Sequence, residues 1–139
     1  DEAADADIIV KAAAVGDYRG AETFSQKIKR EGHGERVLSL VANPDIAAEV
    51  GARKRPGQIL VGFAAETENL RLHAEEKMRR KKLDFIAANL VSGAESAFRR
   101  ETNRVELLSS GEPPQILEGS KDHVAEGIWD AVVRRLSRS

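Results

Sequence analysis

Continuous apolar runs recur along the chain and predict strands that are covered on both faces of a sheet. The three clearest runs are residues 8–15, 58–65 and 83–89. Each of the first two is followed by a segment with helical features. A chain that alternates strand, helix, strand, helix and strand is typical of parallel pairing with right-handed crossovers. The pattern therefore predicts an α/β fold with a Rossmann-like, open, mostly parallel sheet flanked by helices.

The two intervening helices have recognisable starts. Asn43 is suited to cap the first helix and Pro44 to occupy its first turn, while Asp45 complements the positive end of the helix dipole. The second helix is expected to begin at Thr67. Its apolar face repeats every four residues, at Leu70, Ala74 and Met78.

The remaining segments predict a flap, a hairpin and a terminal helix. Residues 16–34 are rich in glycine and charge and are expected to form a functional loop or flap, and residues 36–41 alternate partly as a strand does. Residues 104–108 and 115–117 flank a Gly-Glu-Pro-Pro turn, which predicts a hairpin. An amphipathic helix is expected from Ser120 onward.

Composition and charge narrow the possible functions. Of the 139 residues, 41% are hydrophobic and 32% charged, which is ordinary for a globular domain. The formal net charge of -1 gives no overall field favouring nucleic acid or an anionic membrane. The absence of cysteine excludes disulfides, thiolate zinc sites and a cysteine nucleophile, and it is compatible with a cytoplasmic location. No apolar stretch approaches the roughly 20 residues that cross a bilayer, and the histidines lack metal-ligand spacing.

Three features are expected beyond the carboxyl ends of the parallel strands, where open α/β sheets bind ligands. Small residues after the first strand allow a flat ligand to approach the backbone near Asp17, although tight helix packing also requires small residues. The helix start at Pro44 offers free N–H groups to a phosphate, as every helix start does. Lys77 and Lys81 lie one turn apart and point the same way, although such basic runs are commonest on solvated faces. These residues favour a phosphate-rich ligand.

Several motifs, taken in order, resemble a known family. They are AAAVGDYR at residues 12–19, QKIKR at 26–30, ANPDIAA at 42–48 and GFAAETEN at 62–69. The later segments KKLDFIAAN, TNRVELL and SKDHVAEGI agree with the same family. Together they resemble the synthetase half of the bacterial bifunctional phosphopantothenoylcysteine decarboxylase/synthetase. The resemblance implies that residues 1–139 form a CTP-binding phosphopantothenate–cysteine ligase domain.

The family implies a two-step ligation in coenzyme A biosynthesis. CTP activates the carboxylate of 4'-phosphopantothenate as an acyl-cytidylate, and the amine of L-cysteine then attacks and releases CMP. The anhydride is needed because a free carboxylate has only oxide as its leaving group. Mg²⁺ is implied with the triphosphate, and FMN only where a decarboxylase domain is fused upstream. The family further implies a cytoplasmic homodimer with the flap at its interface, and no nucleic-acid or membrane partner.

The resemblance also implies the residues of the nucleotide site. Lys27 aligns with a flap lysine that contacts phosphate and is important for activity, so it is the expected catalytic residue. The other expected nucleotide-binding residues are Lys11, Ala12, Ala13, Asp17, Pro44, Asp45, Ile46, Ala47, Phe63, Lys77 and Lys81.

This sequence departs from the family pattern in two places. A preceding segment with a glycine-rich turn and an asparagine needed by the acyl-cytidylate is not in it, and Leu90 stands where the family has aspartate after Ala88-Asn89. Two other function classes are open from the residues alone. The sheet pattern fits a nicotinamide-dependent oxidoreductase, and the basic run from Lys77 to Lys82 fits a nucleic-acid-binding module, whose binding would be salt-sensitive.

Overall fold

The computed structural model describes residues 2–26, 37–66, 69–90 and 103–138. Their contacts define two compact units. The smaller unit is Ala13–Ile46, and the larger unit combines Asp1–Ala12 with Ala47–Ser139.

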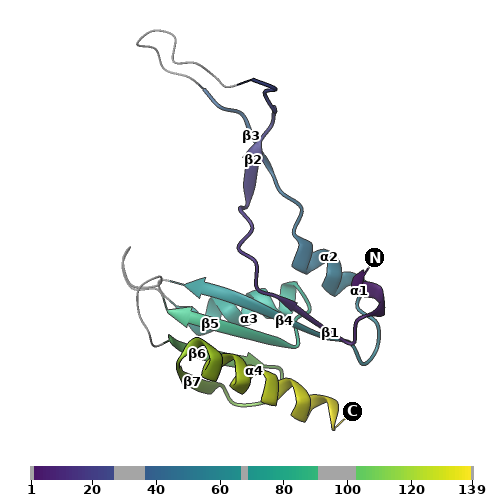
Figure 1. Cartoon of the computed structure of the whole chain (residues 1–139), viewed down its shortest axis with the longest axis vertical. Helices are drawn as coiled ribbons and strands as arrows, with labels where there is room; N and C mark the ends of the chain where they lie inside the picture. Colours follow the sequence, from purple (N-terminus) through teal and green to yellow (C-terminus); the bar gives the residue numbers. More distant parts are fainter. Residues whose placement is uncertain (1, 27–36, 67–68, 91–102, 139) are drawn as a thin grey trace. The chain divides into compact units, whose positions relative to one another are not determined.

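The larger unit is built on a five-stranded sheet with the strand order β1-β4-β5-β6-β7 (Figure 1). The first three of these strands run parallel, and the last two extend the sheet as an antiparallel hairpin. This mostly parallel sheet confirms the predicted fold class. The strands are β1 (Ile8–Lys11), β4 (Ile59–Glu66), β5 (Phe85–Leu90), β6 (Asn103–Ser109) and β7 (Gln115–Gly119).

Successive side chains of each strand point to opposite faces of this sheet, and helices pack against both faces. Ile59 and Val61 of β4 belong to the core beneath α4, whereas Leu60 and Ala64 belong to the core beneath α3. Burial on both faces explains why the strands read as continuous apolar runs. The helices are α1 (Glu2–Asp5), α2 (Ile46–Arg53), α3 (Leu70–Arg80) and α4 (Lys121–Leu136).

The hairpin and the terminal helix are where the sequence predicts them. Gly111 takes a positive φ of 82° in the hairpin turn. Ser120 caps α4, and its Oγ accepts a hydrogen bond from the N–H of His123 at 3.1 Å. The start of α3 is different, because β4 runs on to Glu66 and the helix begins only at Leu70. Asn69 turns the chain into α3 at a φ of 49°, a left-handed conformation that asparagine tolerates better than most residues.

The first strand is shorter and more exposed than its apolar run predicts. β1 ends at Lys11, and Val10 is 47% exposed, so the prediction of a strand from residue 8 to residue 15 buried on both faces is wrong. The reason is its place in the sheet: β1 is an edge strand among the described residues, and Val10 lies beyond the cover of α4. Only Ile8 of its α4-side residues packs against that core.

The smaller unit contains a two-stranded antiparallel ribbon. Its strands are β2 (Tyr18–Gly20) and β3 (Leu40–Ala42), and β3 overlaps the strand expected at residues 36–41. β2 was not predicted, because its three residues are all exposed and show no alternation. Lys27 lies outside the described residues.

Candidate functional site

The helix start and the end of the first motif meet in the smaller unit. The N–H of Asn43 donates to the carbonyl oxygen of Asp17 at 2.8 Å. The Nδ2 of Asn43 donates to the carbonyl oxygen of Gly16 at 2.7 Å. These two bonds place Asp17 beside the segment that leads through Pro44 and Asp45 into α2, although the two motifs lie far apart in sequence.

Asn43 holds the ribbon together and does not cap the helix. Its Oδ1 accepts from Nη1 of Arg19 at 3.0 Å, and the same nitrogen donates to the carbonyl oxygen of Ala42 at 3.0 Å. Because α2 begins at Ile46, the position before the first helical residue is Asp45, so the predicted cap at Asn43 is wrong. The sequence placed Arg19 inside a motif but gave it no role, since no periodicity links it to Asn43.

In the larger unit, β1 ends before its neighbour β4 does, so the end of β4 has no partner on that side among the described residues. The two strands pair from Ile8 with Ile59 to Lys11 with Gly62. β4 continues to Glu66 and pairs there with β5 only. Phe63, which is 46% exposed, is therefore the first residue of β4 beyond the end of β1. The structure thus brings Lys11 and Phe63 together at a sheet edge, while Ala12 and Ala13 are exposed residues that follow β1.

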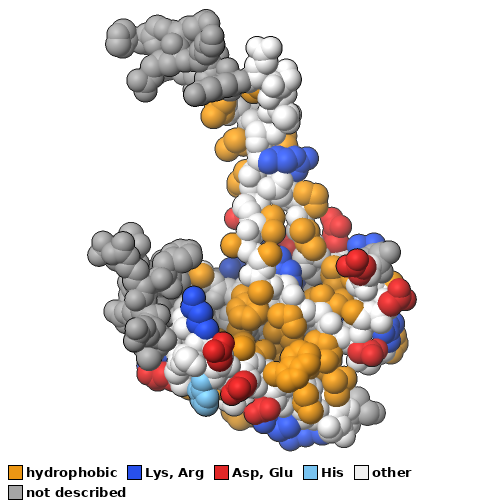
Figure 2. All heavy atoms as spheres, viewed as in Figure 1, with side chains coloured by type: hydrophobic (Ala, Val, Ile, Leu, Met, Phe, Trp, Pro, Cys, Tyr) orange, Lys and Arg blue, Asp and Glu red, His pale blue; other side chains and the backbone are white. Residues whose placement is uncertain are grey.

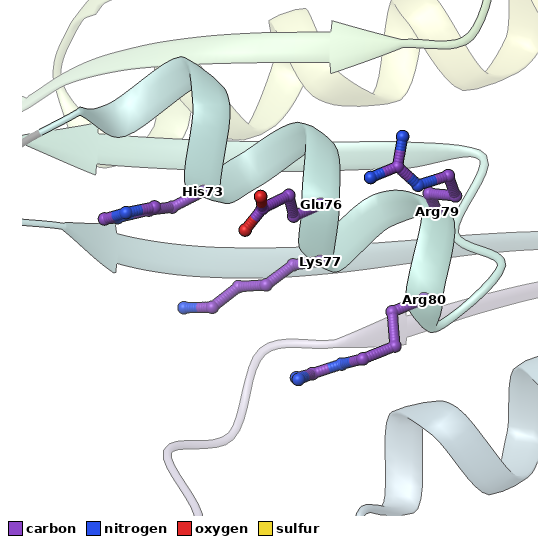
Figure 3. Close-up of a pocket in the computed structure, with 5 residues that line it drawn as sticks. All are labelled: His73, Glu76, Lys77, Arg79 and Arg80. Atoms are coloured by element: carbon purple, nitrogen blue, oxygen red, sulfur yellow. The ribbon is translucent and has the colours of Figure 1, made fainter.

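A hollow of about 480 Å³ lies along α3 (Figure 3). Lys77 lines it and is half-buried, as is His73. The helix that carries them is fixed to β6 by Arg71, whose Nε donates to Glu106 at 2.7 Å. By accepting this hydrogen bond, and by its charge, Glu106 raises the pKa of the Arg71 guanidinium above its ordinary value. The residues lining the hollow are His73, Glu76, Lys77, Arg79 and Arg80.

Lys81 lies at the end of α3 and contacts α2 through its main chain. Its N–H donates to the carbonyl oxygen of Lys77 at 3.0 Å, which closes the last turn of the helix. Its own carbonyl oxygen is so close to Gly51 of α2 that a Cβ built on Gly51 would lie 1.9 Å from it. The residues Ala47 to Arg53 of α2 are therefore tied directly to the end of the helix that carries Lys77 and Lys81.

The described residues offer neither a metal-binding cluster nor a membrane-spanning helix. No group of three or more histidine and acidic side chains is placed there to hold a metal ion. The described chain thus supplies no carboxylate cage for Mg²⁺, which proteins often bind through one or two carboxylates together with the phosphates of a substrate. No helix in these same parts of the chain is long and apolar enough to cross a membrane.

These features define an α/β domain with a ligand-accessible strand end and a basic helix face. Residues 1–136 match the family described as the DNA/pantothenate metabolism flavoprotein C-terminal domain, and the chain belongs to this family.

The chain is also similar to individual proteins. It is 37% identical over 132 residues to the coenzyme A biosynthesis bifunctional protein CoaBC of Haemophilus influenzae, covering 95% of this chain and 32% of that protein. It is 44% identical over 102 residues to a cysteine/cysteine sulfinic acid decarboxylase of an unknown prokaryotic organism, covering 73% of this chain and 28% of that protein. The chain thus spans about a third or less of these relatives' lengths.

A solved structure shares the fold. The crystal structure of the C-terminal domain of the coenzyme A biosynthesis bifunctional protein CoaBC superposes with a TM-score of 0.74 at 27% identity. The match covers 99% of this chain and 59% of that one. It supports the mostly parallel sheet and its flanking helices as the fold of the family.

Proposed function

We propose that this chain is the ligase part of a phosphopantothenate–cysteine ligase of coenzyme A biosynthesis. CTP activates 4'-phosphopantothenate, and L-cysteine is the acceptor. Family membership and the 37% identity to a coenzyme A biosynthesis protein support this function. The observation that carries it is the pair of bonds from Asn43 to Gly16 and Asp17, because these bonds join two of the motifs on which the resemblance depends.

The proposed chemistry requires positioning and charge neutralisation. In the first step a carboxylate oxygen of 4'-phosphopantothenate attacks the α-phosphorus of CTP, and pyrophosphate leaves. In the second step the cysteine amine attacks the acyl carbon, the C–O bond to the nucleotide breaks, CMP leaves and the amine loses a proton. The backbone after β1, the N–H groups at the start of α2, Lys77 of α3 and Lys81 directly after it would hold the nucleotide. Lys27 would neutralise charge on the phosphates as they separate, since lysine acts as a mobile point charge.

Mg²⁺ is part of the proposal and would accompany the triphosphate. It would supply charge neutralisation at the phosphates when bound. FMN belongs to the proposal only where a decarboxylase domain is fused upstream, and a cytoplasmic location is proposed for the whole protein.

We also propose that the family's preceding segment, with its glycine-rich turn and asparagine, completes the domain in the natural protein. This chain covers 59% of the solved domain that it matches. Strands of parallel sheets are normally covered on both faces. Yet large apolar side chains of the larger unit are exposed at β1, β4 and α4, and Figure 2 shows hydrophobic side chains gathered on that unit. The exposed residues are Val10, Phe63, Trp129 and Val133.

A homodimer is proposed on the basis of the smaller unit. Several exposed apolar residues lie close together in its sequence, and leaving them in water costs free energy. Burying them against a second copy of the chain would remove that cost. Because these residues lie within the expected flap segment or follow it directly, the flap would contribute to the interface. These residues are Phe24, Val37, Leu38 and Leu40.

Pyrophosphate release tests the function. The full natural protein, given 4'-phosphopantothenate, should release pyrophosphate with CTP faster than with ATP, and should form phosphopantothenoylcysteine once cysteine is added. Replacing Lys27 with glutamine should leave folding intact and slow ligation severely. No pyrophosphate release with either nucleotide, together with thermal stabilisation by NAD(P), would instead support an oxidoreductase.

A further inference from the structure

The basic run on α3 is not uniform, because its arginines point to different sides of the helix. Lys77 and Arg80 are three positions apart, so they share one face of α3. Figure 3 shows their side chains extending to the same side of the helix, while the side chain of Arg79 extends to the other side. The sequence alone gives no reason to separate Arg79 from Arg80, and only the structure does so.

The side chain of Arg80 has no hydrogen bond or ion pair with a described residue. Most long cations elsewhere in the larger unit have a partner: Arg71 contacts Glu106, Arg55 contacts Asp7, and Arg138 contacts Glu112. Arg80 lines the hollow beside Lys77, where the only acidic lining residue is Glu76. The hollow therefore has excess positive charge and contains a guanidinium whose donors are unused by the described chain.

The chemistry of these groups selects a phosphate ligand. A guanidinium presents paired N–H donors that match two oxygens of a phosphate, and lysine adds a point charge. A nucleic-acid duplex would require a wider basic surface, and Glu75 and Glu76 interrupt the charge of this helix. A compact hollow of about 480 Å³ instead suits a single phosphate-bearing group.

We propose that Arg80 is a further phosphate-binding residue of this site and acts beside Lys77. The proposal rests on the proposed ligase function and deepens it, because the resemblance assigns Lys77 and Lys81 but not Arg80. The phosphate comes from one of two substrates, the triphosphate of CTP or the phosphate of 4'-phosphopantothenate. Arg80 binds the phosphate through two N–H groups, so a side chain that supplies only positive charge does not fully replace the guanidinium.

The test compares Arg80→Gln with Arg104→Gln in the full natural protein. CTP binding is measured by titration calorimetry, and the KM for 4'-phosphopantothenate is measured by pyrophosphate release. Arg80→Gln should weaken one of these about tenfold, the low end expected for losing a charge-assisted hydrogen bond at an exposed site. Weaker CTP binding identifies the triphosphate as the ligand, and a higher KM with unchanged CTP binding identifies the substrate phosphate. Arg104→Gln, which changes an exposed arginine of β6 outside the hollow, should change neither value by more than about twofold.

Two further measurements distinguish the loss of the paired N–H donors from a loss of charge and from a loss of folding. Arg80→Lys should recover only part of the loss, because it restores the charge and not the paired donors. Melting curves of all variants should coincide, since an exposed side chain without a partner contributes little to folding. Equal values for Arg80→Gln and Arg104→Gln would overturn the role of Arg80, as would equal losses of binding to a duplex RNA in both variants. A wild-type protein that binds no CTP would overturn the ligase function itself.

Discussion

Replacing Gly51 with alanine would drive a methyl group into the main chain at the end of α3. A Cβ built on Gly51 lies 1.9 Å from the carbonyl oxygen of Lys81 and 2.9 Å from its carbonyl carbon. Ordinary contact begins at 3.4 Å, so α2 and the end of α3 would have to separate by about 1.5 Å. The atom in the way belongs to the backbone, so no side-chain rotation can relieve the clash.

Two effects of opposite sign compete in this variant. Alanine is favoured over glycine within a helix by about 1 kcal/mol. Overpacking a well-filled site costs about 1–3 kcal/mol, and a backbone clash lies at the upper end of that range or beyond it. We therefore expect a net loss of about 2 kcal/mol in the free energy of unfolding, with the melting temperature lowered by about 7 °C.

Urea denaturation of wild type and Gly51→Ala measures this loss. A second glycine provides the control, because a Cβ on Gly127 would meet a side-chain carbon of Leu117 at 2.7 Å. Shortening Leu117 to alanine should therefore rescue part of the packing strain in Gly127→Ala. Shortening Lys81 to alanine should not rescue Gly51→Ala. A Gly51→Ala protein as stable as wild type, or one restored by Lys81→Ala, would refute the reasoning.

Substitutions at two further positions test the contacts that hold the strands and the ribbon. The Oδ2 of Asp84 accepts hydrogen bonds from the N–H of Leu60 at 2.7 Å and from Lys54 at 2.6 Å. Asp84→Ala should therefore lower the free energy of unfolding, measured by urea denaturation, by about 3 kcal/mol. Asp84→Asn should lower it by only about 1 kcal/mol. Equal costs would show that a neutral acceptor at this position recovers none of the loss, which contradicts the expected role of the hydrogen bond from Leu60. Asn43→Ala removes the bond to Gly16, so limited proteolysis within residues 13–46 should accelerate while global stability changes little. Unchanged cleavage would show that the ribbon does not depend on Asn43.

Much of the larger unit could be predicted because its signals are local. Continuous apolar runs marked the buried parallel strands, and a glycine-proline turn marked the hairpin. Ser120 and the four-residue repeat after it marked α4. The errors fall where distant residues decide the outcome: the length of β1 depends on what lies beside it, and the start of α3 depends on how far β4 extends.

The smaller unit could not be predicted for a different physical reason. Its strands are three residues long and exposed, so the sequence shows no sign of β2 and only a partial alternation that overlaps β3. The bonds from Arg19 and Asn43 stabilise the ribbon across more than twenty positions of sequence. The motif resemblance anticipated that these segments belong to one site, but it could not supply the bonds. Arg80 was missed for the same reason, since its distinction from Arg79 is a direction in space.

The described groups also fit what nucleotide activation of a carboxylate requires. The attacking carboxylate is already ionised near neutral pH, so the first step needs no protein base to create its nucleophile. Its barrier is dominated by bringing two anions together, which positive charges and free N–H groups lower. In the proposed reaction, the cations on and directly after α3 would supply such charges. The first step should therefore depend more steeply on removing these cations, and on ionic strength, than on pH near neutrality.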